Sequence, residues 1–367
     1  MTRSVRLVAA TLAIAACGDS SSTSAPDDAA AARGTLASAT TTVLLSGLDS
    51  PRGLAFGPEG ALYVVEAGNG TINGPCIAVA RGQLCYSGTG GVTRYWKGQR
   101  ERVVSGLPSQ YNTTTLDVGG PHDIGFLGRG HAFVTIGLGN DPARRAEFGA
   151  PGADLGHLIK LEPSGKWRAV ADVSAVEAES NPAGGPVDSN PFGLLVEPGS
   201  RFVADAGGNS LIEIRADGSM SVVATFAPTS SPAPFNTSEA VPTEVERGPD
   251  GALYVSKLTG VPFVAGNAAI MRVVPGEAPT VFAGGFKTIT DFAFAPDGSM
   301  YVIEYASAPV FFGGPGRLTR VAPDGTRTVV SATLEFPTGV TVGPDGAVYV
   351  SNKGSVPGAG EVLRVVP

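Results

Sequence analysis

One short phrase recurs six times along this chain of 367 residues, and no other feature constrains its fold as strongly. In the last copy an apolar run at Gly339–Val342 is followed by Pro344-Asp345-Gly346 and then by an alternating run at Ala347–Ser351. A unit this short cannot bury its own faces, so its repetition predicts neighbouring units packed against one another. The copies span Pro51–Glu66, Pro121–Ile136, Pro191–Asp205, Pro242–Lys257, Ile289–Glu304 and Pro337–Asn352.

Each copy has the pattern of a β-hairpin. Alternating apolar residues rich in Val, Tyr and Phe indicate strands, and Pro-Asp-Gly between two of them is a tight turn, because Pro presets φ and Gly accepts a positive φ. A second hairpin follows in most copies, as at Ser210–Arg215 and Ser219–Phe226 around Ala216-Asp217-Gly218. Four antiparallel strands per unit predict the blade of a β-propeller.

The sixth copy predicts how the ring of blades closes. It contains only three strands, the last being Glu361–Val366, whereas a further strand at Thr41–Ser46 precedes the first copy. We expect this N-terminal strand to complete the last blade. The predicted fold class is all-β: a six-bladed β-propeller over residues 41–367, with four antiparallel strands per blade.

The first forty residues lie outside the repeats. Arg3 and Arg6 precede a short apolar run at Leu7–Ala13, and Ile14-Ala15-Ala16-Cys17 resembles a bacterial lipobox. The resemblance implies a lipoprotein signal peptide over residues 1–16, lipidation of Cys17 and an exported protein that contacts the membrane only through this anchor. Residues 17–40, rich in Ser and Ala, would form a tether. An ordinary signal peptide is the alternative.

The cysteine count agrees with an exported protein, and the net charge argues against one class of binding partner. Besides Cys17, the chain has only Cys76 and Cys85, and an even pair in an oxidising compartment predicts a disulfide. A formal net charge of −7 argues against nucleic acid as a partner. We expect a monomer.

Connection lengths predict where binding takes place. The turns between the first and second strands are uniformly tight, whereas long segments join the second strand to the third and one unit to the next, as at Ala67–Gly90 and Ser174–Asn190. In a four-stranded meander these two kinds of connection emerge on the same side, here called the loop-rich face. Long loops on a rigid scaffold usually carry function, so we expect a small molecule or a protein partner there.

The repeat register places a set of mostly ionisable side chains at the channel mouth on this face. We predict catalytic roles for His122 and Asp123. Converging acids need a cation or shared protons, which suggests a divalent metal such as calcium or zinc. The predicted ligand-binding residues are Arg52, Glu244, Lys257 and Asp291, and the predicted metal ligands are Glu66, Asp205, Glu304 and Asn352. The alternatives are acids that bond the backbone, a merely polar channel, and a structural histidine.

Several segments resemble known families. Gly47–Phe56, Gly119–Ile124 and Asn190–Gly193 resemble the ScyD/ScyE-type propeller proteins, and the third copy is similar to an NHL-type repeat. This resemblance implies an exported binding propeller and names no reaction.

Two enzyme families are similar in blade position. Metal-dependent lactonases of the gluconolactonase type would place a metal at Glu66, Asn352 and Asp205. Soluble quinoprotein sugar dehydrogenases would use His122 as a general base. These remain the alternative functions.

Overall fold

The computed structural model describes residues 39–308 and 313–367. The chain divides into two units, residues 1–33 and 34–367, and every element described below belongs to the second. The predicted signal peptide and the lipidation of Cys17 lie outside the described residues.

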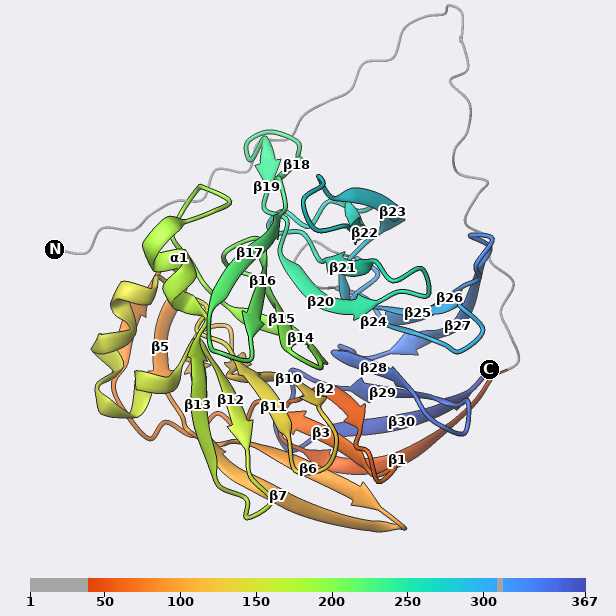
Figure 1. The fold of residues 1–367 in the computed structure, drawn as a ribbon, viewed down its shortest axis with the longest axis horizontal. Helices are drawn as coiled ribbons and strands as arrows, with labels where there is room; N and C mark the ends of the chain where they lie inside the picture. Colours follow the sequence, from red (N-terminus) through yellow and green to blue (C-terminus); the bar gives the residue numbers. More distant parts are fainter. Residues whose placement is uncertain (1–38, 309–312) are drawn as a thin grey trace, which may run out of the picture. The chain divides into compact units, whose positions relative to one another are not determined.

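Four-stranded antiparallel sheets make up most of the described chain, and six of them follow the sequence repeat (Figure 1). The first strands are β2 (Pro51–Phe56), β10 (Pro121–Phe126), β14 (Pro191–Glu197), β20 (Pro242–Arg247), β24 (Ile289–Phe294) and β28 (Gly339–Val342). The second strands are β3 (Leu62–Glu66), β11 (Ala132–Ile136), β15 (Ser200–Asp205), β21 (Leu253–Lys257), β25 (Met300–Glu304) and β29 (Val348–Asn352). The third strands are β6 (Gly90–Trp96), β12 (His157–Leu161), β16 (Ser210–Arg215), β22 (Ala268–Val273), β26 (Gly316–Val321) and β30 (Gly360–Val366). The fourth strands are β7 (Gln99–Leu107), β13 (Trp167–Asp172), β17 (Met220–Thr225), β23 (Thr280–Phe286), β27 (Arg327–Leu334) and β1 (Thr40–Leu48).

The first strands contact one another in a closed cycle that runs β2, β10, β14, β20, β24, β28 and back to β2. The last sheet is completed from the other end of the chain, because β1 pairs antiparallel with β30 and Thr40 lies opposite Val366. In Figure 1 the red N-terminal strand lies beside the blue C-terminal one. The predicted pairing of these two strands is confirmed.

Apolar side chains fill the space between neighbouring sheets. In one core cluster Leu45 and Val362 of the last sheet pack with Leu54 and Val64 of the first. The alternation seen in the sequence places these residues on the faces that two sheets share, and their removal from water stabilises the contact.

A bulge recurs where the first and second strands of a sheet begin to pair. Pro51 lies opposite Glu66 and Leu54 opposite Val64, so two residues of β2 face one residue of β3. The same irregularity occurs at the start of β10, β14, β20 and β24. A bulge changes the direction of the side chains within it, so it influences which side chains are directed toward the predicted channel mouth.

A separate four-stranded sheet, here called the side sheet, lies between the first and second repeats in the sequence. The sequence predicted only a long loop there. Its strands are β4 (Cys76–Val79), β5 (Gly82–Tyr86), β8 (Gln110–Asn112) and β9 (Val118–Gly119).

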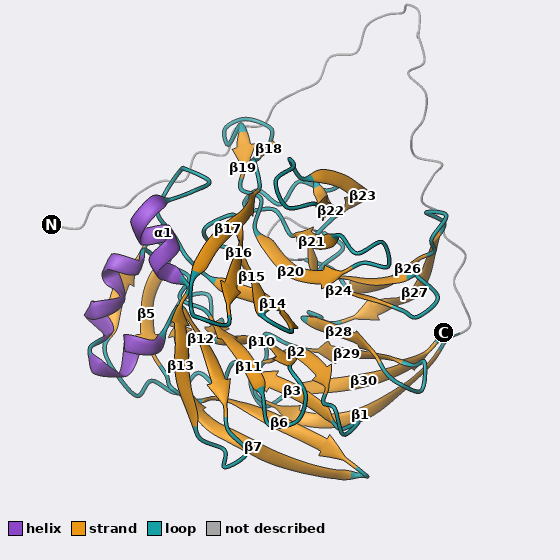
Figure 2. Cartoon of the chain, in the orientation of Figure 1, coloured by secondary structure: helices purple, strands orange, loops and turns teal. Residues whose placement is uncertain are grey.

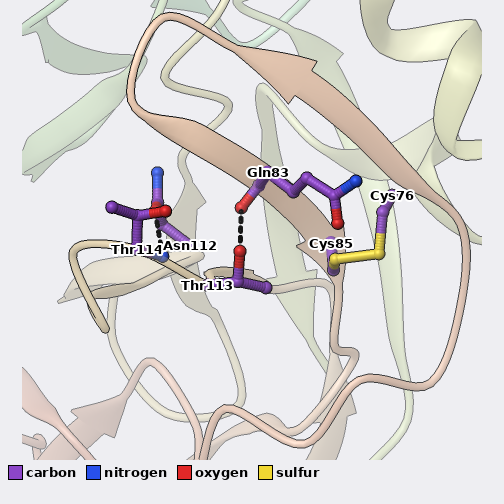
Figure 3. Close-up of a disulfide and its surroundings, with 6 residues drawn as sticks. All are labelled: Cys76, Gln83, Cys85, Asn112, Thr113 and Thr114. Carbon is purple, nitrogen blue, oxygen red and sulfur yellow. Dashed lines mark hydrogen bonds between the residues drawn. A yellow bond between two sulfur atoms is a disulfide. The ribbon is translucent and has the colours of Figure 1, made fainter. Parts of the chain in front are cut away.

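The predicted disulfide between Cys76 and Cys85 is confirmed, and it joins directly paired residues of β4 and β5. Figure 3 shows this bridge and the Thr113 hydroxyl, which donates to the Gln83 carbonyl at 3.4 Å.

Short helices and one hairpin occupy the remaining long connections. Two 3-10 helices, Pro142–Phe148 and Ala150–Asp154, follow β11, and α1 (Ser174–Ser180) follows β13. The first of them contacts β4 and α1, and Figure 2 shows the helical segments beside β5. The small hairpin pairs β18 (Thr229–Ser230) with β19 (Thr237–Ser238).

In the part of the chain that the structure describes, no helix has the length and apolar character to cross a membrane.

Candidate functional site

The second residue of the repeat phrase joins neighbouring sheets in half of the copies. The Thr338 hydroxyl donates to the Pro51 carbonyl at 2.6 Å, and the Thr290 hydroxyl donates to the Pro337 carbonyl at 3.0 Å. Thr243 donates in the same way to the Ile289 carbonyl at 3.2 Å. Each of these three buried bonds ties a first strand to the start of the next, so threonine here has a structural role.

The other three copies carry Arg52, His122 and Phe192 at this position, in three consecutive sheets. The His122 ring stacks on the Phe192 ring, with centroids 4.2 Å apart and planes 20° apart. Arg52 lies close enough for its charge to act on His122. The three residues that replace the structural threonine therefore lie together, and we call them the mouth triplet.

The side sheet holds the Arg52 guanidinium in place. Its Nη2 donates to the Val118 carbonyl at 2.6 Å and to Asp117 Oδ1 at 3.2 Å. The side chain is buried, and its Nε has no hydrogen-bond partner in the described structure. An unpaired charged donor out of water is costly, so this nitrogen favours a ligand that supplies an acceptor.

His122 is buried and uncharged. Burial, and then the nearby charge of Arg52, lower its pKa well below the usual 6.5, against the opposing effect of a hydrogen bond to Asn190. A Cβ on Gly137 would lie 2.5 Å from His122 Nε2, so the glycine leaves room for the ring. Because the Asn190 bond favours protonated His122, Asn190 acts as the acceptor; the unpaired ring nitrogen, Nδ1, is then free to accept a hydrogen bond.

One residue after this repeat position, the second, fourth and fifth sheets each carry a buried acid. Asp123 accepts from the Leu194 amide at 2.8 Å, and Asp291 accepts from the Val340 amide at 2.7 Å, each across to another sheet. Glu244 takes the corresponding place in β20. A Cβ on Gly53 would collide with the Asp123 carboxylate, so the glycine of one sheet makes room for the acid of the next.

The pKa values of these acids, and that of the nearby Glu246, are raised above their ordinary values. Burial raises the pKa of Asp123 to about 7 and that of Glu246, two residues beyond Glu244, to about 8. Burial, followed by the charge of Asp123, raises the pKa values of Glu244 and Asp291 well above their ordinary ones. The neighbouring Glu244 side chain opposes part of this rise in the pKa of Asp123.

The four predicted metal ligands are not brought together. They share one position, the last residue of a second strand, and each accepts the amide of the connection that leads into its own sheet. The bonds run from Asp49 to Glu66 at 2.7 Å, from Asn190 to Asp205 at 2.6 Å, from Lys287 to Glu304 at 2.8 Å and from Glu335 to Asn352 at 2.8 Å. This is the backbone-bonding role that the sequence left open.

Both oxygens of the Glu66 carboxylate have partners within the protein. Besides the Asp49 amide on Oε2, Thr93 and the Arg102 guanidinium both contact Oε1 at 2.5 Å. Across residues 39–308 and 313–367, no group of three or more histidine, cysteine or acidic side chains is arranged to hold a metal ion. The channel metal therefore remains a prediction from the sequence.

Lys257 ends β21 at the same repeat position as these acids. Its side chain is buried, and burial lowers its pKa. Unlike the acids, it cannot accept the amide of its connection.

Sequence reasoning missed Phe192, Asn190 and Glu246 as site residues. Phe192 could have been found, since it interrupts a threonine position of the repeat, whereas Asn190 and Glu246 have no such signal.

Comparison with known proteins supports the fold class. No protein-family model and no curated protein matches the sequence. Among solved structures, the chain is similar to a glucose dehydrogenase (14% identity, TM-score 0.54), covering 89% of this chain and 99% of the other. It is also similar to a gluconolactonase from Xanthomonas campestris (12%, 0.53, covering 92% and 93%). A putative gluconolactonase matches as well (13%, 0.51, covering 90% and 93%).

These structural neighbours are β-propeller proteins, and the cycle of four-stranded sheets places this chain in the same fold class. At identities this low the likeness concerns the fold alone.

Proposed function

We propose that this chain is a six-bladed β-propeller that binds a small molecule at the mouth triplet, Arg52, His122 and Phe192. One observation carries the proposal: three neighbouring sheets replace a structural threonine with side chains that leave Arg52 Nε and His122 Nδ1 buried and unpaired. As in the ScyD/ScyE-type proteins that the sequence resembles, the protein would be exported, here with an anchor at Cys17.

The chemistry of the triplet defines the class of ligand. Arg52 offers a charged donor, which suits a carboxylate. Neutral His122 offers an acceptor, which suits a hydroxyl group, and Phe192 lends an apolar wall beside it. A small ring that carries both a carboxylate and a hydroxyl would satisfy all three, as a sugar acid does.

Matched ligand pairs would test this proposal. D-Galacturonate and D-galactose differ at the carboxylate, so calorimetric titration should show tighter binding of the acid to the wild-type protein. Arg52→Gln should weaken galacturonate binding at least tenfold, equivalent to about 1.4 kcal/mol, and abolish the preference. The exposed Arg81, changed to Gln, is the matched control and should bind like the wild type.

Equal binding of acid and sugar, or a preference that survives Arg52→Gln, would contradict the proposal. Circular dichroism and melting of each variant would separate lost binding from lost folding.

Hydrolysis of a lactone is the second candidate function, since two structural neighbours carry the name gluconolactonase. Turnover of glucono-1,5-lactone that requires added calcium or zinc would support it, and the same assay with pyrroloquinoline quinone and glucose would test sugar oxidation. Turnover lost in His122→Ala would make the triplet catalytic rather than a binding site alone.

A further inference from the structure

Four of the six sheets that follow the repeat share a pair of side chains, a tyrosine of the second strand opposite an arginine of the third. The pairs are Tyr63 and Arg94, Tyr254 and Arg272, Tyr301 and Arg320, and Tyr349 and Arg364. In the fourth, fifth and sixth sheets the arginine donates to the aspartate of the turn before the second strand, at 2.8 Å to Asp250, 2.7 Å to Asp297 and 2.7 Å to Asp345. The turn therefore fixes these three guanidinium groups.

The first sheet departs from this arrangement. Its turn acid is Glu59, one methylene longer than aspartate, and it accepts from the Tyr63 hydroxyl at 2.5 Å. Arg94 Nε lies 3.5 Å from Glu59 Oε1 and Arg94 Nη1 lies 3.6 Å from Glu101 Oε2, and neither contact is a hydrogen bond. Nε is buried and has no hydrogen-bond partner among the described residues. Because a charged donor out of water is costly when unpaired, Arg94 favours a ligand that supplies an acceptor.

Arg94 lines a cavity of about 450 Å³ between the first and second sheets. The turns that line it include Glu59 before β3, Gly130 before β11 and Pro163 between β12 and β13. These tight turns lie at the opposite strand ends from the long connections, and no residue of the mouth triplet lines the cavity. Its volume falls within the roughly 300–1,000 Å³ of small-molecule sites, so it is a second candidate site on the other face.

A small side chain on the fourth strand leaves this space open. In the fourth sheet Phe282 packs edge-on against Tyr254, with ring centroids 4.9 Å apart, and Tyr254 is only 4% exposed. In the first sheet the residue at the same position, two after the partner of the arginine, is Val103. Valine has no ring to cover Tyr63, which is only partly buried and lines the cavity.

Apolar groups form one wall of the cavity. The ring of Phe126, at the end of β10, lies 4.9 Å from that of Tyr63, and Val103 and Leu161 line the cavity beside them. An aromatic ring bound there would bury its surface against two others, as Phe282 does in the fourth sheet.

Charged side chains of both signs surround the rest of the cavity. They are Arg94, Arg129, Glu59, Glu101 and Glu162, besides the exposed His131. A ligand carboxylate at Arg94 would also lie near Glu59 and Glu101, which repel it. A positive group on the same ligand offsets this repulsion, so the charges favour a zwitterion over a simple anion.

We propose that this cavity binds a free amino acid with an aromatic side chain. Its carboxylate accepts from Arg94 Nε, and its ammonium pairs with the exposed carboxylate of Glu101. Arg94 and Glu101 are neighbours, as are the carboxylate and the ammonium of an amino acid. The ring packs beside Tyr63, in the place that Phe282 fills beside Tyr254.

L-Phenylalanine is the probe for this proposal, in calorimetric titration at about pH 6, where α-amino groups are protonated. N-Acetylphenylalanine lacks the ammonium and phenylalaninamide lacks the carboxylate, so each should bind at least tenfold more weakly. Arg94→Gln should weaken phenylalanine binding at least tenfold and leave the binding of phenylalaninamide unchanged. Arg272→Gln is the matched control, because Asp250 holds that arginine at the same repeat position, and it should bind phenylalanine like the wild type.

Val103→Phe is a second variant that fills the cavity with the ring present in the fourth sheet. It should abolish phenylalanine binding while the protein still melts cooperatively, which separates lost binding from lost folding. The proposal is overturned if millimolar phenylalanine does not bind, or if the three probes bind equally. Binding that survives Val103→Phe would place the amino acid elsewhere, including the mouth triplet, and would overturn it as well. Because the probe is not a sugar acid, the result is independent of the function proposed for the mouth triplet.

Discussion

A single repeated residue position serves two purposes in this protein. Threonine there links neighbouring sheets, and three copies carry another residue instead. In the second sheet Thr135, on the adjacent strand, supplies this link by donating to the Phe192 carbonyl at 2.5 Å. The inter-sheet bond is thus kept while His122 is released from a structural role.

The raised pKa values of Asp123 and Glu246 predict an unusual dependence of stability on pH. The ordinary pKa values of Asp123 and Glu246 are 3.8 and 4.5, whereas the folded protein raises them to about 7 and about 8. Between these limits the native state binds more protons than the unfolded chain, so stability falls as pH rises. Thermal melting in EDTA should therefore give a melting temperature ~4 °C or more higher at pH 5 than at pH 8.

The variant Asp123→Asn should flatten this pH dependence, and Glu179→Gln, at an exposed acid, should leave it unchanged. His122 acts in the opposite direction below pH 6.5, because its pKa in the folded protein lies well under that value. A melting temperature that rises steadily from pH 5 to pH 8 would show that the interior acids are ionised in the native protein.

At the scale of elements, the side sheet links the disulfide to the mouth triplet. β5 carries Cys85 and pairs with β8, which pairs with β9, whose Val118 carbonyl holds Arg52. A change in the side sheet would therefore change the position of the Arg52 guanidinium.

Replacing Cys76 and Cys85 together by serine should loosen the side sheet. The two cysteines are 9 positions apart, and closing a loop of about that size stabilises by about 2.5 kcal/mol in the chain-entropy model. Hydrogen exchange measured by mass spectrometry should become faster over residues 76–86 and 110–119 and stay unchanged in β20–β23. Oxidised wild-type protein is the reference, and reduced wild-type protein should exchange like the variant. Unchanged exchange in residues 76–86 and 110–119 would contradict the prediction.

The elements also show what sequence patterns can and cannot predict. Pro-Asp-Gly turns and alternating strands indicated the hairpins, because that information is local. The side sheet was missed, since its four short strands come from two connections and pair only in three dimensions. The bulge was missed for the same reason, and it decides that Asp123 points to the next sheet while Glu66 bonds its own connection.

At the scale of the whole molecule, β1 closes the cycle of sheets. Leu45 and Leu48 of β1 are buried against Leu54 of the first sheet and Val362 of the last. A chain that begins at Asp49 should lose about 4 kcal/mol from these two leucines alone, besides the strand pairing. We expect it to melt far lower than a chain that begins at Ala39, or to aggregate through the exposed β30 edge.

Differential scanning calorimetry of the two chains would measure this loss. Equal melting temperatures would mean that the cycle is stable without β1.

Because β1 closes the cycle, the arrangement of the sheets in space does not depend on which sheet comes first along the chain. Thr40 and Val366 are paired neighbours, so in a chain that begins at Thr40 a short linker could join it to the C-terminal strand, and new ends could be opened in any of the other connections between sheets. Such a circular permutant would keep every inter-sheet contact. The repeat that comes first in this sequence is therefore set by where the chain opens in the cycle of sheets, and any other repeat could come first.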